Sequence, residues 1–351
     1  MRFRGILRTN NRYTMITSTR EVQEEQAIET SLRPQAFDDY IGQDQIKQNL
    51  FIAIEAAKKR EDTLDHMMFY GPPGLGKTSL AHLISHTLGS NMKVTSGPAL
   101  EKPGDLASIL TNIEEGDILF IDEIHRLSKT LEEVLYSAME DFVLDIIVGK
   151  GPSARTLRLD LPKFTLIGAT TKFGSLSGPL RSRFGNVYGF DFYETHHITE
   201  IVRRSSDILA VTFDSDQVLE EIAMRSRQTP RVANRLLKRV RDYAEVYNEG
   251  VITEQVTKDT FELLGVDTYG LEDGDRKLLE SLVHKFHGGP VGLSTLAAST
   301  AEEIITIEEI YEPFLIRYGF IQRTARGRIA TDGCYEYLGI RNNYNKQGTI
   351  L

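Results

Sequence analysis

One stretch decides the fold of this chain: Gly71-Pro72-Pro73-Gly74-Leu75-Gly76-Lys77-Thr78. It follows an apolar run at 67–70 that is typical of a buried strand, and a helical pattern at 78–84 comes after it. A glycine-rich loop in this context lets backbone N–H groups surround phosphate oxygens at a helix N-terminus. The pattern predicts that Lys77 reaches the β- and γ-phosphates and that the Thr78 hydroxyl ligates Mg²⁺. A glycine-rich turn without a ligand is the alternative.

A second apolar strand is expected at 117–121, and it ends in two carboxylates, Asp122 and Glu123. Carboxylates at the end of a buried strand indicate a cationic or polar partner. Asp122 suits the Mg²⁺ shell, and Glu123 suits orientation or deprotonation of an attacking water. A strand end that meets solvent is the alternative interpretation.

Hydroxyl and guanidinium groups follow further along the chain. Thr170 and Thr171 end a third apolar run, where a hydroxyl could contact the γ-phosphate or cap the strand. Arg181 and Arg183 lie in a short helical turn without a nearby acid in the sequence. A guanidinium suits a phosphoryl group, so these arginines either face a neighbouring subunit's nucleotide or are solvated. Arg231 begins a helix after Thr229-Pro230, an N-cap and first-turn proline, and could swing onto a nucleotide.

The composition limits the class of protein. The chain has 351 residues, a net charge of −9 and one cysteine, Cys334, which excludes a disulfide framework and fits a reducing cytoplasm. No apolar run is long enough for a membrane span. The arginine-rich first fourteen residues do not resemble a secretory signal, and translation could begin at Met1 or Met15. Because the net charge is negative, any contact with DNA requires a local basic patch.

The expected organisation is a disordered arm at 1–25, a parallel α/β domain at 26–194, a small all-α domain at 195–265, a further domain at 270–340 and a tail at 341–351. A protruding hairpin is predicted at 143–161. Three helices and a β-ribbon in the last domain describe a winged helix. Its ribbon carries the predicted basic patch, in which no acid separates the arginines: Arg317, Arg323, Arg326 and Arg328.

Together these motifs resemble the RuvB family of AAA+ ATPases, the motors of Holliday-junction branch migration. The resemblance runs from about Leu32 to Gly339. Besides the phosphate loop, the matching signatures are Leu32-Arg33-Pro34 with Phe37-Asp38-Asp39-Tyr40-Ile41-Gly42-Gln43, Asp122-Glu123-Ile124-His125-Arg126, Glu140-Asp141-Phe142, Leu166-Ile167-Gly168-Ala169-Thr170-Thr171, Arg181-Ser182-Arg183-Phe184-Gly185, Thr229-Pro230-Arg231, Glu312-Pro313-Phe314-Leu315 and Gly319-Phe320-Ile321-Gln322-Arg323-Thr324. The phosphate loop is shared by many ATPases, whereas the first of these signatures, the hairpin and the winged-helix ending are more specific to this family.

The resemblance implies a P-loop parallel-sheet domain, a helical lid and a winged helix that act as a homohexameric ATPase. Asp122 and Glu123 would serve Mg²⁺ and water activation beside Lys77. Thr171 would be the first sensor, with Thr170 as the alternative, Arg183 the finger into the adjacent subunit, and Arg323 and Arg328 the DNA contacts. The implied ATP contacts are Leu32, Arg33, Tyr40, Ile41, Gly74, Gly76, Lys77, Thr78, Ser79, Glu140, Asp141, Phe142, Tyr193 and Arg231.

The implied partners are the duplex arms of the junction, RuvA docked on the 143–161 hairpin, and RuvC. The sequence departs from the family pattern at three positions. Gln228 replaces a usual glycine, Lys172 a usual arginine, and Ile304 an arginine that would face DNA. Two other functions share these motifs: an ATP-switch clamp loader or replication initiator, and a winged-helix transcription regulator.

Overall fold

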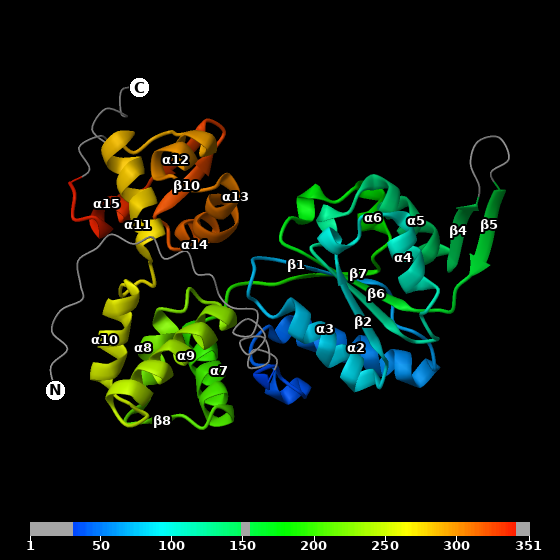
Figure 1. Cartoon of the computed structure of the whole chain (residues 1–351), viewed down its shortest axis with the longest axis horizontal. Helices are drawn as coiled ribbons and strands as arrows, with labels where there is room; N and C mark the ends of the chain where they lie inside the picture. The colour runs from blue at the N-terminus through cyan, green and yellow to red at the C-terminus, as the bar shows by residue number, and fades with distance from the viewer. Residues whose placement is uncertain (1–30, 149–154, 342–351) are drawn as a thin grey trace. The chain divides into compact units, whose positions relative to one another are not determined.

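The computed structural model describes residues 31–148 and 155–341 (Figure 1), so the predicted arm and most of the predicted tail lie outside the described residues. The chain divides into two units, residues 1–33 and 34–351, and the elements below belong to the second. No helix in the described ranges combines the length and apolar character that crossing a membrane requires.

A five-stranded parallel sheet forms the first domain of this unit. In the order β2-β3-β6-β1-β7, its strands are Met92–Ser96, Ile118–Asp122, Thr165–Thr170, Met67–Tyr70 and Asn186–Gly189. The central strands β3 and β6 are buried along almost their whole length because helices cover both faces, which is usual for a parallel sheet.

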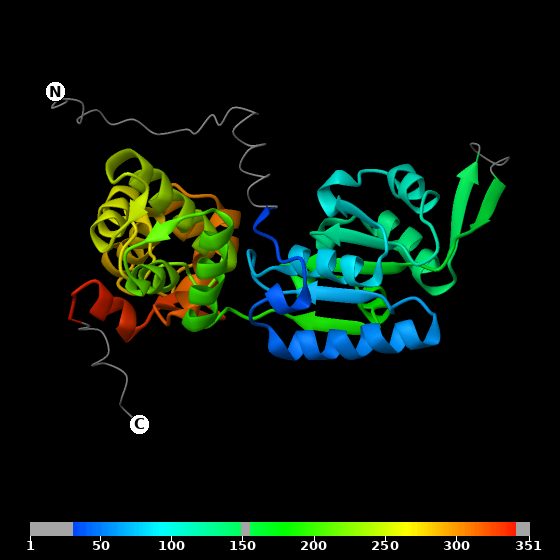
Figure 2. The ribbon, with the colours of Figure 1, turned by 90° about the horizontal axis from the view of Figure 1, so that it is seen from below.

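Alternating side chains assign the helices to the two faces of the sheet. Met67 and Phe69 join one core with α2 (Asp44–Arg60) and α3 (Lys77–Leu88). Met68 points into the other core, with α4 (Pro103–Leu110) and α5 (Lys129–Glu140). Figures 1 and 2 show these helices on opposite sides of the strands. The short elements are η1 (Phe37–Asp39), η2 (Gly97–Ala99), η3 (Ile124–Arg126), η5 (Phe173–Ser175) and α6 (Gly178–Ser182).

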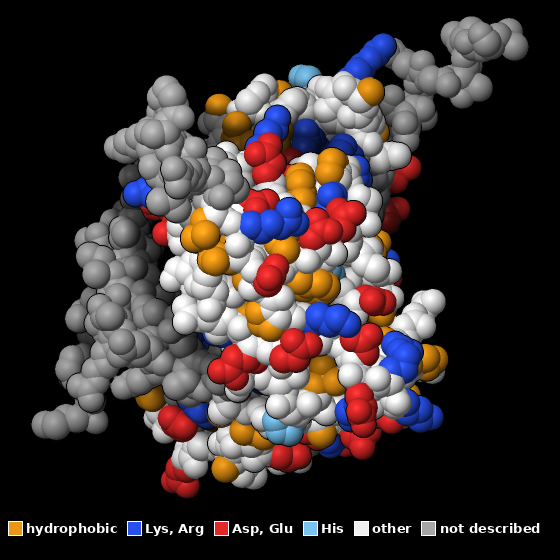
Figure 3. Space-filling model, turned by 90° about the vertical axis from the view of Figure 1, so that its right-hand side faces the viewer, with side chains coloured by type: hydrophobic (Ala, Val, Ile, Leu, Met, Phe, Trp, Pro, Cys, Tyr) orange, Lys and Arg blue, Asp and Glu red, His pale blue; other side chains and the backbone are white. Residues whose placement is uncertain are grey.

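An antiparallel hairpin projects from this domain beyond α5 (Figure 1). It consists of β4 (Val143–Val148) and β5 (Arg155–Asp160), with Val143 opposite Asp160. The tip at 149–154 lies outside the described residues. Figure 3 shows this side of the molecule with acidic and basic side chains interspersed rather than separated into patches.

A small helical domain follows. Its helices are α7 (Thr195–Ile208), α8 (Asp216–Met224), α9 (Pro230–Tyr247) and α10 (Glu254–Leu264). The expectation of an all-α domain misses a short parallel pair, β8 (Thr212–Phe213) with β9 (Val251–Ile252). Thr229 occupies the N-cap of α9, but its hydroxyl donates to the Ser226 carbonyl instead of capping the helix, at 3.2 Å.

The last domain has a core of its own, built around Leu278, Leu296, Phe314 and Tyr335. Its elements are α11 (Asp273–Glu280), η6 (Ser281–Lys285), α12 (Leu293–Thr300), α13 (Ile304–Thr306), η7 (Ile307–Tyr311), α14 (Glu312–Arg317), β10 (Ile321–Thr324), β11 (Gly327–Ala330) and α15 (Asp332–Tyr337). The π turn η7 precedes Pro313, which has no N–H for a regular helical bond. Strands β10 and β11 form the predicted antiparallel ribbon.

The departure at Gln228 has a backbone consequence that a substitution can test. Gln228 has a φ of 54°, in the left-handed region where a side chain costs about 1 kcal/mol and glycine does not. We expect Gln228→Gly to raise the free energy of unfolding by about 1 kcal/mol at most, which would appear as a higher midpoint of urea unfolding. Gln255→Gly, on the exposed face of helix α10, is the matched control and should lower stability by a similar amount. A lower midpoint for Gln228→Gly would mean that its side-chain contacts outweigh the backbone strain.

Candidate nucleotide site and DNA-binding ribbon

The carboxyl ends of three adjacent strands create the candidate site. Strand β6 lies between β3 and β1, and Tyr70 is in register with Thr170. Because the strands are parallel, the 71–76 loop, Asp122 and Thr170 meet at one edge of the sheet. The structure therefore brings together the residues that three separate sequence motifs predicted.

The loop has the backbone that its glycines predict. Gly76 has a φ of 92°, and a Cβ there would lie 2.8 Å from the Tyr40 hydroxyl. A Cβ on Gly71 would lie 2.5 Å from the Phe190 carbonyl oxygen. The loop can therefore pass between these neighbours only without side chains at these positions, and its N–H groups stay accessible to a phosphate.

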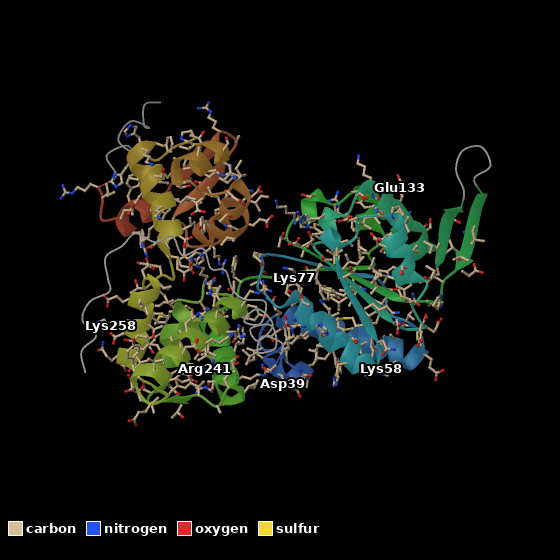
Figure 4. The ribbon with its side chains drawn as sticks, in the orientation of Figure 1. Asp39, Lys58, Lys77, Glu133, Arg241 and Lys258 are labelled. Atoms are coloured by element: carbon tan, nitrogen blue, oxygen red, sulfur yellow. The ribbon has the colours of Figure 1, made fainter. Side chains whose placement is uncertain are left out.

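Lys77 begins α3 beside this loop (Figure 4) and is only 8% exposed. Its ammonium donates to the carbonyl oxygens of Gly71 and Pro72, each at 2.8 Å. Burial lowers the pKa of Lys77 to about 8; the Asp122 carboxylate opposes this shift and Arg231 adds to it. The ammonium thus lies across the loop, where the oxygens of a triphosphate would replace the two carbonyls as acceptors.

The two predicted acids occupy different backbone environments. Asp122 ends β3, and its Oδ1 accepts the Glu123 N–H at 2.9 Å. Glu123 has a φ of 47°, a conformation that non-glycine residues adopt at a cost. A Cβ on Gly97 would lie 2.4 Å from the Glu123 carbonyl oxygen, so Gly97 makes room for this turn. Glu123 is the N-cap of η3, and its carboxylate pairs with Arg126 at 3.3 Å.

The structure separates the roles of the two threonines. Thr170 is buried, and its Oγ1 lies 2.9 Å from His125 Nδ1 and accepts the Lys172 N–H at 2.9 Å. The Thr170 hydroxyl therefore ties the strand end to η3, which favours Thr171 as the sensor. His125 is a site residue for which the sequence predicted no role. Burial is the main cause that lowers its pKa, so the imidazole is neutral near pH 7.

Two tyrosines and the start of α9 contact the same loop. The Tyr193 hydroxyl donates to the Leu75 carbonyl at 3.2 Å and lies 3.4 Å from the Tyr40 hydroxyl. Burial raises the pKa of Tyr193 to about 12. The Arg231 N–H donates to the Gly74 carbonyl at 3.4 Å. The predicted contacts from the helical domain are thus adjacent to the loop, as are Thr78 and Ser79 in α3.

The pocket predictions at Leu32, Arg33 and Ile41 stay predictions. Leu32 and Arg33 belong to the 1–33 unit. Ile41 is half-buried, directly after Tyr40.

A second group of predicted residues lies at the end of α5 instead. Arg183 Nη2 donates to Glu140 Oε2 at 2.7 Å, so the expectation of an arginine without an acidic partner is wrong. The sequence hid this pair because 43 residues separate its members. Asp141 is the C-cap of α5, and Phe142 packs against His66 and Phe164. These residues are candidates for contact with a nucleotide on another subunit.

The candidate metal ligands, Thr78 and Asp122, suit Mg²⁺ better than a metal ion held entirely by protein side chains. Among residues 31–148 and 155–341, no cluster of three or more His, Cys, Asp or Glu side chains could hold a metal ion. Mg²⁺ usually takes one or two protein ligands together with phosphate oxygens and water. Thr78 and Asp122 match that requirement.

The ribbon arginines have a partner that the sequence analysis missed. Arg323 and Arg328 are opposite each other on β10 and β11, and each directs its Nε and Nη2 to the Glu312 carboxylate at 2.8–3.0 Å. Glu312 is 1% exposed. Burial alone would raise its pKa, but the hydrogen bonds from the two arginines outweigh burial and lower it. The patch is therefore partly neutralised, and Arg326 at the exposed turn becomes a further candidate for phosphate contact.

The lowered pKa of Lys77 generates a prediction for nucleotide binding. A bound triphosphate favours the charged amine, so binding raises the pKa and the protein takes up a proton at about pH 8.5. Proton uptake on binding should vanish at pH values well below the pKa of Lys77 in the free protein, because the amine is already charged there. Calorimetry in buffers of different ionisation enthalpy measures this proton. Lys77→Arg, which stays charged, is the control; proton uptake by this variant at pH 8.5 would assign the effect to another group.

Known proteins resemble the whole described chain. Family models match residues 32–189 as the RuvB P-loop domain, 193–267 as the RuvB AAA lid and 268–339 as the RuvB C-terminal winged helix. A RuvB subunit of the Holliday junction branch migration complex from Dehalococcoides mccartyi (strain CBDB1) is 55% identical over 334 residues, 95% of each chain.

Solved structures agree with these matches. The Thermotoga maritima RuvB Holliday junction branch migration motor has a TM-score of 0.81 at 48% identity, covering 89% of this chain and 99% of its own. A mutant of that protein has a TM-score of 0.81 at 49% identity, and the match covers 88% of this chain and 99% of the mutant chain. With the P-loop domain, lid and winged helix of RuvB matched in this order over residues 32–339, the chain belongs to the RuvB family.

Proposed function

We propose that this chain is an ATP-driven DNA motor that moves the branch point of Holliday junctions in recombination and repair. The observation that carries the proposal is the meeting of the glycine loop, Lys77, Asp122 and Glu123 at one sheet edge, in a chain that ends in a winged helix. Nucleotide binding alone requires neither a water-activating carboxylate nor a DNA-binding domain, so their combination favours a motor.

The residues divide the chemistry between them. Tyr40 and Ile41 would line the adenine and ribose pocket. Lys77 would hold the terminal phosphates, and Thr78 and Asp122 would hold Mg²⁺, which supplies charge neutralisation when bound. Glu123 would orient the attacking water and accept its proton, with Thr171 and Arg231 beside the γ-phosphate.

The second group of residues requires a neighbouring subunit. Arg183, Glu140 and Asp141 lie together at the end of α5, whereas Lys77 begins α3 on the opposite face of the sheet. We therefore propose a homohexameric ring in which Arg183 of one subunit reaches the γ-phosphate bound by the next. The ring would act in the cytoplasm.

The projecting hairpin is the proposed docking site for RuvA. The half-exposed Leu157 on β5 offers an apolar side chain that a partner would cover. We also propose RuvC as a partner at the same junction.

Neither alternative function fits as well. A clamp loader or initiator has no use for a RuvA-docking hairpin. A sequence-reading regulator would use the helix before the ribbon, but that helix carries Glu308 and Glu309 and no basic residue before Arg317. Carboxylates repel DNA phosphates, so this helix is poorly suited to the major groove.

Junction dissociation tests the proposed function. Purified protein with RuvA, ATP and Mg²⁺ should separate a four-way junction into duplexes. Glu123→Gln should bind ATP normally but lower turnover by roughly a hundredfold or more, because the attacking water loses its base. Glu262→Gln, an exposed residue of α10, is the matched control and should leave the rate unchanged. Steady turnover in Glu123→Gln would refute its assignment, and an intact junction with active ATPase would refute the motor.

The Glu312 cluster makes different predictions for its two arginines. Arg323 is 54% exposed, so Arg323→Ala should weaken binding equally to unrelated duplexes and flatten the salt slope by about one unit. Arg328 is 15% exposed, so Arg328→Ala should weaken DNA binding less than Arg323→Ala does, whereas both variants should lower the stability of the domain by about 2 kcal/mol because Glu312 loses a charged donor in each. Fluorescence anisotropy at several salt concentrations and thermal melting separate the two effects. Sequence-selective loss in Arg323→Ala would contradict phosphate contact.

A further inference from the structure

Three contacts hold the Arg183 side chain against its own subunit. Nη2 donates to Glu140 at 2.7 Å, and Nη1 donates to the Pro179 carbonyl at 2.8 Å. The guanidinium carbon lies 4.5 Å from the centre of the Tyr136 ring. The side chain is one-quarter exposed, and its Nε is buried without a hydrogen-bond partner among the described residues.

These contacts use different parts of the guanidinium. The N–H donors lie in its plane, and in this structure they bind a carboxylate and a carbonyl. Two of the five N–H donors are used in these bonds, and Nε has no partner among the described residues, so a phosphate can bind the remaining donors or displace Glu140 and Pro179 from the other two. The guanidinium carbon lies over the ring of Tyr136, a cation–π contact that accepts no conventional N–H···O hydrogen bond. This contact with Tyr136 can therefore persist while the hydrogen bonds are exchanged.

Tyr136 also fixes the helix that carries Arg183. Its hydroxyl lies 2.9 Å from Glu132 Oε2 and 2.9 Å from Ser177 Oγ. Ser177 is the N-cap of α6, where it accepts the Leu180 N–H at 3.3 Å. Arg183 is the C-cap of the same short helix. One side chain of α5 thus holds both the start of α6 and the guanidinium at its end.

We infer that Tyr136 is a positioning residue for ATP hydrolysis. It holds the Arg183 guanidinium in the position and orientation from which it reaches the phosphate bound by the neighbouring subunit. The inference deepens the proposed function and rests on it, because it assumes that Arg183 acts on a nucleotide. Glu140 holds the arginine only until a phosphate displaces it. Its carboxylate is 62% exposed, so solvent screens the pair and the exchange is cheap.

The test measures ATP turnover and nucleotide affinity in the assembled full-length protein. Arg183→Ala should lower turnover by roughly a thousandfold with unchanged ATP affinity. Tyr136→Leu should lower kcat about tenfold, equivalent to about 1.4 kcal/mol, with the dissociation constant for ATP unchanged. Tyr136→Phe keeps the ring and should retain turnover within about threefold. Tyr247→Leu, an exposed tyrosine of α9, is the matched control and should behave as wild type.

The double variant distinguishes positioning from a general structural role. If Tyr136 acts through Arg183, then Tyr136→Leu should cause no further loss in an Arg183→Ala background. A further tenfold loss in that background, or wild-type turnover in Tyr136→Leu alone, would overturn the inference. Full turnover in Arg183→Ala would instead overturn the finger itself. Should Tyr136→Leu fail to fold, Tyr136→Met replaces it in the same comparison.

Discussion

The parallel register of β3, β6 and β1 is the constraint on which the site depends. Each strand contributes functional side chains at or just beyond its carboxyl end. These residues are far apart in the sequence, and only the sheet brings them together. The pairing of Tyr70 with Thr170, and of Ile121 with Gly168, aligns the ends. Two apolar cores clamp the sheet from either face, so the alignment is set by burial and not by the polar groups that use it.

The sequence predicted what short patterns encode. Continuous apolar runs marked the buried strands, and the glycines with Lys77 marked the loop, because each signal lies within a few residues. Pairings between distant residues had no such signal. Glu140 meets Arg183 only because α5 and α6 pack together, and Glu312 meets two arginines only because the ribbon folds back on α14. The ribbon arginines, which form a basic patch in the sequence, are therefore partly neutralised by Glu312 in the folded domain.

The two carboxylates whose arginine partners the sequence did not predict have opposite physical characters. Glu312 is buried, so its charge must be met by both arginines at once, and it fixes the ribbon to its domain. Glu140 is exposed, so its pair with Arg183 is weak and reversible. A glutamate thus forms a stable buried ion pair at position 312 and a weak, solvent-exposed ion pair at position 140. The difference between the two pairs comes from burial, because both carboxylates carry the same charge.

The three departures from the family pattern share one region. Lys172 pairs with Glu308 and Glu309 at 3.1 Å, and the Gln228 side chain accepts from Arg317 at 3.3 Å. Ile304 begins the helical segment that carries these glutamates. All three positions therefore lie at contacts between the winged helix and the rest of the chain, or on the helix that makes them. Because Lys172 also donates its N–H to Thr170, these contacts reach the edge of the nucleotide site. Lys172 therefore joins the helical segment that Ile304 begins to the edge of the nucleotide site, whereas Gln228 contacts Arg317 separately.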